Sequence, residues 1–301
     1  MKSSLTMRYL AFMLCISLVF SCTPQKDDPG TDPGPGTGTD TVVLDPNGTK
    51  LAKVIVFTYT QPKQYIEVFE YHYDNLNRIT EITYAKGDSV NGKIEAPNSI
   101  AKKFLYNGNE QLPYRSTGSV PTDVTEDIYH FYDNNGRSVT DSMPASHCNC
   151  YTTKKRQWLS DKTIAQTVTY DSRLGFLISV NDTSLISNNN ISTQTKWDNT
   201  NGQTAFYRTY DNKTNPLNKL NVQAAISFMI TGGVPTPAIN KNNITDYTYG
   251  IIQTTGLNAG TFLKRGAITY TYSYNNAGMP IECEFSETGS TPGKIKFYYT
   301  K

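Results

Sequence analysis

The sequence predicts an all-β fold, in which antiparallel hairpins form one strongly curved sheet or a closed barrel of about 12 to 16 strands. Three observations predict it. Tyrosine is unusually frequent, at 21 of 301 residues, in a chain with only 18% charged residues, and aromatic and β-branched residues favour strands. From Leu51 onward about fourteen runs, such as Val54–Thr60 and Ile268–Tyr274, have a period of two, so that residues of one kind fall on one strand face and residues of another kind on the other face. Short clusters of Asn, Asp and Gly separate these runs, as expected of turns.

Residues 1–21 have the pattern of a secretory signal peptide. Lys2 and Arg8 precede an apolar run from Tyr9 to Phe20, which is too short for a bilayer core that needs about 20 residues. Removing these two basic residues leaves 26 basic residues against 26 acidic ones. A chain with no net charge and no basic run lacks the electrostatic footprint of a nucleic-acid-binding protein.

The segment that follows is expected to attach the protein to a membrane. Leu18–Cys22 resembles the lipobox of bacterial lipoproteins, which implies that Cys22 is acylated and becomes the new N-terminus. Acyl chains on Cys22 would anchor the chain in the outer membrane without a spanning helix. Residues 22–49 are rich in Gly, Pro and Asp, so we expect a lipidated tether rather than a folded unit.

Two further features of this region resemble signals of one bacterial group. Lys26-Asp27-Asp28 is similar to the export signal of Bacteroidetes surface lipoproteins, which implies a domain facing the cell exterior; ordinary solvated linker charge is the alternative. Three tripeptides, beginning at Asp40, Asp88 and Asp141, resemble the O-glycosylation acceptor of the same group. That resemblance implies modification of the following hydroxyl residues, which are Thr41, Ser89 and Ser142.

An aromatic residue followed by Asp or Asn ends seven of the predicted strands. In several of them a Gly or Asn stands three positions after the Asp or Asn. The side chain of that Asp or Asn can accept hydrogen bonds from turn amides, and the Gly or Asn can adopt the positive φ that closes the hairpin. The seven pairs are Tyr73-Asp74, Tyr106-Asn107, Tyr132-Asp133, Tyr170-Asp171, Trp197-Asp198, Tyr210-Asp211 and Tyr274-Asn275.

These turns carry a family resemblance. Residues 73–79 and 132–138 are similar to the YD repeat of large bacterial shell and toxin-delivery proteins. Nearly the whole mature chain resembles uncharacterised surface lipoproteins of Bacteroidetes, which combine a lipobox, a tether and a Tyr-rich domain with an insertion like Tyr210–Leu220. This resemblance implies a porin-like fold without an assigned activity. We therefore expect a single β domain over residues 50–301.

One segment breaks the alternation of the strands. Pro216 stands at a first helical position, apolar residues follow at helical spacing from Leu217 to Phe228, and Gly232-Gly233 is a stop signal. The pattern predicts one short helix near 217–230, packed against the sheet or closing the open end of a barrel. The alternative is a long insertion that wraps the rim.

Cysteine and histidine supply the candidate site residues. Aligning the turns at Tyr73 and Tyr132 places His72 and His130 on opposite faces of their strands, so they are not expected to share a site. A disulfide between Cys283 and either Cys148 or Cys150 competes with free thiols and with a metal site that would include His147. One Cys-x-Cys and one His is a weak ligand set, so we expect no metal and no cofactor.

The sequence does not define a molecular activity. It contains no GxSxG elbow, HExxH helix, P-loop or Rossmann fingerprint, so no enzyme class is indicated. The leading hypothesis is a lipid-anchored surface module that binds a glycan or a protein or has a structural role. Rival hypotheses are a carrier of an apolar molecule inside a half-closed barrel and a glycoside hydrolase with a carboxylate pair. A membrane pore is not expected, because the second strand faces carry Thr, Ser, Lys and Glu.

Overall fold

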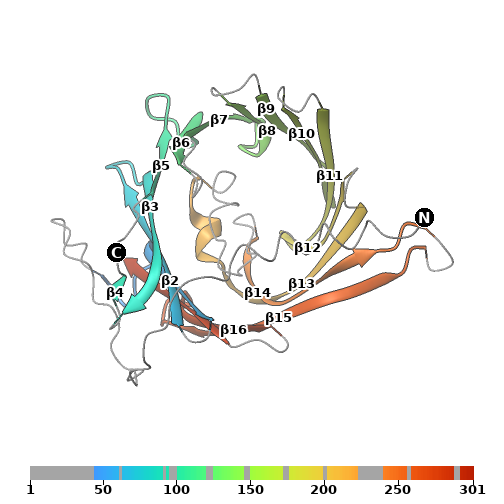
Figure 1. The fold of residues 1–301 in the computed structure, drawn as a ribbon. Coiled ribbons are helices and arrows are strands. Elements are labelled where there is room, and N and C mark those ends of the chain that lie inside the picture. Colours follow the sequence, from blue (N-terminus) through green and yellow to red (C-terminus); the bar gives the residue numbers. More distant parts are fainter. Residues whose placement is uncertain are drawn as a thin grey trace. The chain divides into compact units, whose positions relative to one another are not determined.

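In the computed structural model, sixteen antiparallel strands close into a barrel (Figure 1). The first strand, β1 (Lys50–Thr60), pairs with the last strand, β17 (Gly293–Thr300), so the sheet has no free edge. The predicted all-β meander is therefore confirmed as a closed barrel. The structure describes residues 44–60, 63–90, 93–94, 100–119, 125–145, 150–171, 176–198, 202–222, 240–255, 259–287 and 292–301.

Consecutive strands are neighbours around the barrel, except that β4 (Lys93–Ile94) pairs with β3 alone. The remaining strands are β2 (Lys63–Tyr73), β3 (Ile79–Val90), β5 (Ile100–Leu105), β6 (Arg115–Ser119), β7 (Thr125–Tyr132), β8 (Ser138–Ala145), β9 (Cys150–Trp158), β10 (Lys162–Asp171), β11 (Phe176–Ser187), β12 (Asn190–Asp198), β13 (Gly202–Thr214), β14 (Asn242–Ile252), β15 (Phe262–Tyr274) and β16 (Pro280–Glu287).

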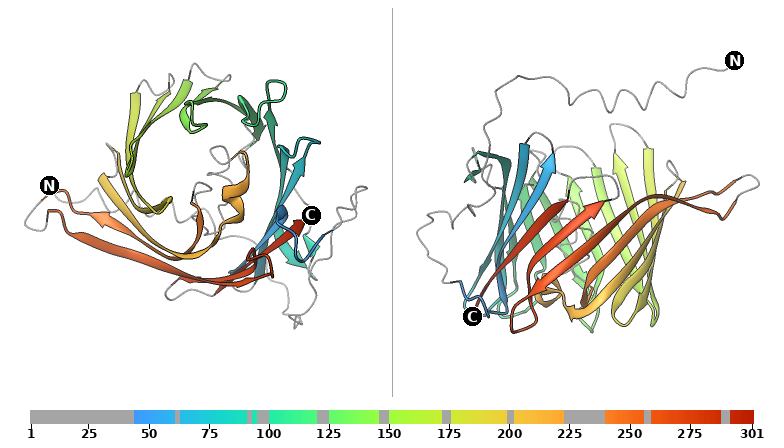
Figure 2. Two further views of the ribbon diagram at one scale, coloured as in Figure 1. Left: turned by 180° about the vertical axis from the view of Figure 1, so that it is seen from behind. Right: turned by 90° about the horizontal axis from the view of Figure 1, so that it is seen from below.

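The lumen holds the principal hydrophobic core. The segment that follows β13 enters the ring of strands, as both views along the barrel axis show (Figures 1 and 2). Its Leu217, Leu220 and Val222 are buried in one cluster with Val54, on β1, and with further strand side chains that therefore face inward. Alternation along the strands then places their other residues on the outer face. A 16-stranded barrel is wide enough to hold such a segment in its lumen.

The helix predicted near 217–230 is not present in the described part of that segment. Only a short 3-10 helix, η1 (Pro216–Lys219), forms, and the backbone at Leu220 is already extended, with φ −77° and ψ 133°. Asn215 caps η1 by accepting a hydrogen bond from the Leu217 amide. Leu217, Leu220 and Val222 are nevertheless buried in the lumen. Residues 223–239 lie outside the described residues.

The predicted turn chemistry is confirmed at three hairpins. The Asp74 side chain accepts from the amides of Leu76 and Arg78, and Asn77 has φ +60°. The turns at Asp133 and Asn275 repeat this arrangement, with Gly136 and Gly278 at positive φ. All three turns join strands at the same end of the meander, because alternate connections of an antiparallel chain lie at one end.

Tyrosine hydroxyls tie neighbouring strands together at this end. Each donates to a backbone carbonyl at or near the start of the adjacent strand, which satisfies both polar groups in partly or fully buried positions. The five pairs are Tyr73 to Leu51 at 2.7 Å, Tyr106 to Ile79 at 2.5 Å, Tyr132 to Pro113 at 2.9 Å, Tyr210 to Ile191 at 2.5 Å and Tyr299 to Pro280 at 2.6 Å. Much of the high tyrosine content is therefore structural.

Candidate functional site

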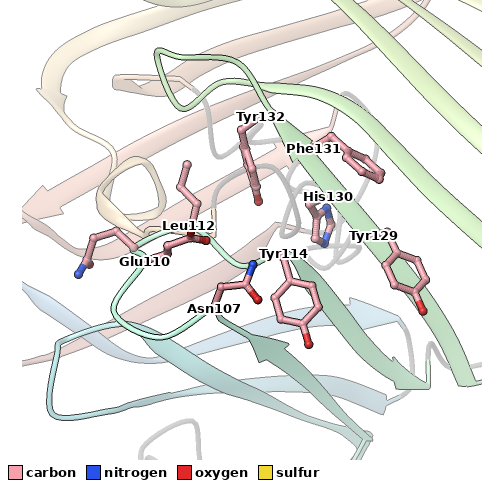
Figure 3. A pocket seen from close by; sticks show the side chains of 9 residues that line it. Asn107, Glu110, Leu112, Tyr114, Tyr129, His130, Phe131 and Tyr132 are labelled. Atoms are coloured by element: carbon pink, nitrogen blue, oxygen red, sulfur yellow. The ribbon is translucent and has the colours of Figure 1, made fainter.

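A hollow of about 660 Å³ lies between the β5–β6 loop and strand β7 (Figure 3). That volume falls in the range of small-ligand pockets in proteins. The loop contributes polar side chains and the strand contributes mainly aromatic ones. The lining residues are Asn107, Glu110, Gln111, Leu112, Tyr114, Tyr129, His130, Phe131 and Tyr132.

Aromatic rings are the most accessible apolar groups of this hollow. Tyr129 is 36% exposed and Phe131 is 53% exposed, and both lie on the opposite side of β7 from His130 and Tyr132 (Figure 3), as alternation requires. Glu110 and Gln111, on the loop, are also exposed and line the same hollow. Ring faces next to amide and carboxylate groups can bind a ligand that has both apolar and hydroxyl surfaces.

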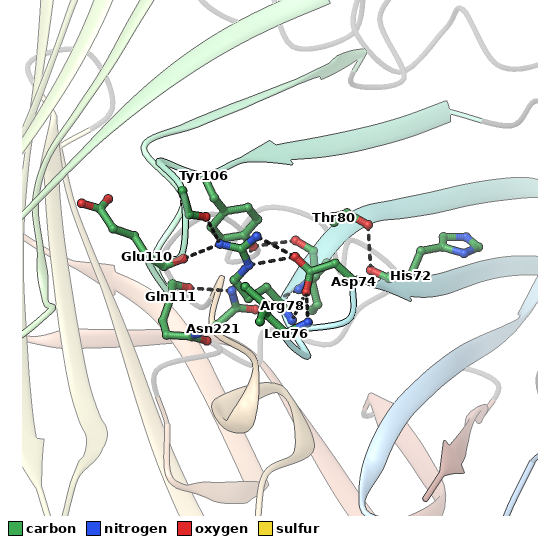
Figure 4. A network of polar contacts seen from close by, with 11 residues as sticks. His72, Asp74, Leu76, Arg78, Thr80, Tyr106, Glu110, Gln111 and Asn221 are labelled. Atoms are coloured by element: carbon green, nitrogen blue, oxygen red, sulfur yellow. Dashed lines mark hydrogen bonds and ion pairs between the residues drawn. The ribbon is translucent and has the colours of Figure 1, made fainter.

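The loop that forms one wall is held from two sides (Figure 4). Arg78 Nη1 donates to the carbonyl oxygens of Gly108 and Glu110, at 2.8 Å each, and its Nη2 is 2.7 Å from Asp74 Oδ2. From the other side, Asn221 of the segment that follows β13 donates a hydrogen bond from Nδ2 to the Gln111 carbonyl at 2.7 Å. Because Arg78 of the Asp74 turn and Asn221 of the segment after β13 both hold it, the loop is organised before any ligand binds.

A buried polar network, which includes the lining residue His130, lies on the lumen side of strands β6 to β9. His130 is hydrogen-bonded through Nε2 to Ser116 Oγ at 2.9 Å and through Nδ1 to Asp141 Oδ1 at 2.8 Å. Arg156 donates to Asp141 Oδ2 at 2.6 Å and to Ser138 Oγ at 2.6 Å. Burial opposes ionisation of Asp141, but hydrogen bonds from His130 and Arg156 outweigh it and hold the pKa of this carboxyl below its ordinary value.

The order of atoms in this network is that of a serine hydrolase triad, with Ser116, His130 and Asp141 in sequence. The hydroxyl of a nucleophile must be reachable by the substrate, and Ser116 has 0% of its surface exposed. Arg156 also occupies the second carboxylate oxygen of Asp141. The network therefore acts as a cross-strand brace, which keeps β7 and its aromatic side chains in place.

The predicted positions of the histidines are confirmed for the two that the structure describes. His72 is exposed on the outer face of β2, whereas His130 is buried on the lumen side of β7. Sequence reasoning treated His130 as an isolated strand residue and missed its network. No local motif could have shown it, because its five members come from four strands.

Of the alternatives left open for Cys283, the structure has the free thiol and not the disulfide with Cys148 or Cys150. Cys283 is a buried free thiol on β16, and β9, which begins at Cys150, lies on the far side of the barrel (Figure 1). Disulfide formation requires Cα atoms within about 7 Å, so the barrel keeps these residues apart. Cys150 is disulfide-bonded to a cysteine other than Cys283. His147 and Cys148 lie outside the described residues.

The residues expected to be modified are only partly described. Cys22 and Thr41 lie outside the described residues, and so does the side chain of Ser89 on β3. Ser142 lies on β8, next in sequence to the inward-facing Asp141, so it is on the outer face. Within the described ranges, no group of three or more His, Cys, Asp or Glu side chains is placed to hold a metal ion. No described helix combines the length and apolar character needed to cross a membrane.

A closed sixteen-stranded antiparallel barrel with a segment in its lumen defines a porin-like β-barrel fold. Two solved structures share it. One is a porin-like protein from Bacteroides vulgatus, with a TM-score of 0.52 and 9% identity, covering 83% of this chain and 98% of that one. The other is a porin-like protein from Bacteroides uniformis, with a TM-score of 0.51 and 12% identity, covering 83% of this chain and 96% of that one.

This similarity confirms the expected porin-like fold. At sequence identities of 9% and 12% it supports a shared fold and no shared function. No protein-family model and no curated protein matches the sequence.

Proposed function

We propose that the protein is a lipid-anchored β-barrel of the outer membrane that faces the cell exterior and binds glycans at the hollow beside β7. The observation that carries the binding role is the pair of exposed rings, Tyr129 and Phe131, which line the same hollow as Glu110 of the β5–β6 loop. Sugar rings offer an apolar C–H face to aromatic side chains and hydroxyl groups to amides and carboxylates.

The outer face of the barrel supports an anchor rather than a barrel embedded in lipid. Lys53 and Glu70 form an ion pair at 2.8 Å on the outer face of β1 and β2, and Lys294 lies 3.0 Å from Glu282 on β17 and β16. Charged residues on the lipid face of a membrane barrel cost about 2–4 kcal/mol each near the bilayer midplane for Lys and Arg. We therefore assign membrane attachment to acylated Cys22, with residues 22–49 as the tether.

A hydrolase is less well supported at this site. Glycoside hydrolysis needs two carboxyl groups on either side of the scissile bond, and Glu110 is the one carboxylate among the described residues that line the hollow. The arrangement suits binding better than bond cleavage.

Glycan binding can be tested with the purified full-length chain on an array of soluble plant and mucin oligosaccharides. We expect binding that Phe131→Ala reduces about 10-fold or more, because aromatic residues in binding sites contribute roughly 1–3 kcal/mol. Tyr151→Ala is the matched control, since Tyr151 is also an exposed ring, at 44%, but lies on β9 outside the hollow. Equal binding by Phe131→Ala and the wild type would contradict the assignment.

The anchor and the modifications need separate measurements. Cys22→Ala should abolish incorporation of labelled palmitate, and undiminished labelling would refute the lipoprotein assignment. Protease treatment of intact cells should remove the barrel if it faces the exterior. Mass spectrometry of the native protein should show O-linked sugars at Thr41, Ser89 or Ser142, and unmodified peptides at all three positions would exclude this modification.

A further inference from the structure

The outer face of strands β9 to β13 carries apolar side chains that the rest of the chain leaves uncovered. Phe206, on β13, packs against the lumen core, so its neighbour Tyr207 faces outward. The register of the sheet carries this assignment from β13 to β9 and places one exposed apolar side chain of each strand on the outer face. A group of such side chains on adjacent strands marks a contact surface. The five are Tyr151, Ile164, Leu185, Trp197 and Tyr207, each 39–44% exposed.

These strands reverse the polarity of the opposite side of the barrel. On β1, Val54 faces the lumen core and Lys53 faces outward. On β9 and β13, the charged side chains of Arg156 and Arg208 face the lumen instead. A polar inner face combined with an apolar outer face is the pattern of a barrel wall that contacts lipid.

Apolar side chains on the outer face of β1 and β2 are covered by the chain itself. Ile55, Phe57 and Ile66 form a cluster there and are only 2%, 7% and 0% exposed. The five side chains on β9 to β13 each keep more than a third of their surface exposed. They are therefore not a second core, and their surface is free for a partner.

The charges on the outer face of β9 to β13 have one sign. We call this surface the β9–β13 face; it consists of the outward side chains of residues 151–157, 162–170, 179–185, 193–197 and 203–209. The charged side chains among them are those of Lys155 and Lys162. Asp182 is the one carboxylate within these ranges, and it lies on the lumen side, where it accepts from Gln194. The outward carboxylate of Asp246, on β14, borders the face.

This composition matches an anionic membrane surface. Tyrosine and tryptophan rings are favoured at the level of the lipid headgroups, and exposed aliphatic side chains gain free energy at the boundary with the acyl chains. Each lysine near an anionic membrane surface strengthens the attraction, whereas a carboxylate would weaken it. The two lysines and the inward position of Asp182 therefore give the face the charge that complements anionic lipid.

We propose that the β9–β13 face lies on an anionic lipid surface. The rings and aliphatic side chains contact the headgroup region, Lys155 and Lys162 lie beside anionic headgroups, and the side of the barrel that bears Lys53 remains in water. The contact fixes which side of the barrel faces the membrane, and it depends neither on acylation of Cys22 nor on glycan binding. It also uses strands other than β7, which lines the hollow.

The test uses residues 23–301, which lack the leader and Cys22 but keep every strand of the barrel. Co-sedimentation is measured with vesicles of phosphatidylglycerol and phosphatidylcholine, and with pure phosphatidylcholine vesicles as the uncharged comparison. We expect binding to the anionic vesicles that Leu185→Glu weakens about 10-fold. Leu76→Glu is the matched control and should not change binding. Leu76 is also an exposed leucine, at 40%, but it lies in the turn between β2 and β3, across the barrel from β11 (Figure 1).

Tryptophan fluorescence shows whether this face makes the contact. The chain has two tryptophans, and Trp158 lies on the lumen side of β9, where its Nε1 donates to the Ser138 carbonyl at 2.8 Å. Anionic vesicles should shift the emission to shorter wavelength, and Trp197→Phe should remove this shift while Trp158→Phe retains it.

Several results would overturn the proposal. They are no binding to anionic vesicles, equal binding to both kinds of vesicle, equal binding by Leu185→Glu and the unsubstituted chain, or a shift that survives Trp197→Phe. Self-association that Leu185→Glu abolishes, without vesicle binding, would assign the face to a second copy of the chain and would also overturn it.

Discussion

Asp141→Asn tests whether the polar network around His130 holds the barrel wall together. The substitution keeps the shape of the side chain and removes its charge, which leaves Arg156 buried without a carboxylate. The side chains of Asp141 and Arg156 are only 12% and 10% exposed, and their atoms are 2.6 Å apart. Breaking a buried ion pair by removing one partner costs about 3–5 kcal/mol. We therefore expect the free energy of unfolding at pH 7 to fall by about that amount in urea titrations.

The pH dependence of this loss gives a second, independent readout. The folded state holds the pKa of Asp141 below the ordinary value of 3.8, so the carboxylate stabilises the fold fully above that value. This contribution disappears as pH falls through the folded-state pKa. The difference between the wild type and Asp141→Asn should accordingly stay constant from about pH 5 to 8 and shrink below about pH 4.

A matched variant shows which results would refute this reasoning. Arg115 and Asp127 form the same kind of pair at 2.7 Å on the outer face, but their side chains are 32% and 34% exposed. Exposed pairs contribute little to stability, so Asp127→Asn should lose only a small fraction of what Asp141→Asn loses. Equal losses in the two variants, or wild-type stability for Asp141→Asn, would show that burial of the network does not stabilise the wall.

Two further predictions concern single side chains. Tyr299→Phe removes the 2.6 Å hydrogen bond that the Tyr299 hydroxyl, in a side chain only 2% exposed, donates to the Pro280 carbonyl. The free energy of unfolding should fall by about 1–2 kcal/mol in the same urea assay. An unchanged urea midpoint would show that this hydrogen bond does not stabilise the contact between the two strands. Burial raises the pKa of the Cys283 thiol to about 12, so at pH 8 it should resist iodoacetamide in the folded protein and react after unfolding, as mass spectrometry can show. Rapid labelling of the native protein would disprove this.

The fold was predictable to the extent that local chemistry determines it. Asp74 and Asn77 specify a hairpin by hydrogen bonding and positive φ within five residues, and strand alternation needs only neighbouring residues. Closure of the barrel depends on β1 meeting β17, some 240 residues later in the chain, and no short pattern encodes that pairing. Within the described part of the predicted helix, residues 217–222, only the 3-10 helix η1 forms, and the lumen that buries these residues is built by distant strands.

The candidate sites were less predictable, since side chains meet there across several strands. Ser116, His130 and Asp141 come together only after β6, β7 and β8 are in register. Composition could not show this arrangement. The choice between a disulfide and a free thiol at Cys283 was also left open by the sequence, because cysteine counting ignores the width of the barrel.

Hydroxyl partners and exposure divide the aromatic residues into two functional groups. Five tyrosines donate their hydroxyl hydrogen bonds to backbone carbonyls on neighbouring strands, so replacing them should mainly affect stability. They are Tyr73, Tyr106, Tyr132, Tyr210 and Tyr299. Tyr129 and Phe131 leave ring surface exposed at the hollow, where burial does not account for an aromatic side chain. If the binding proposal is right, loss of Phe131 should reduce glycan binding at unchanged stability, whereas loss of Tyr299 should do the reverse. This opposite pattern is what separates the scaffold of this barrel from its candidate binding surface.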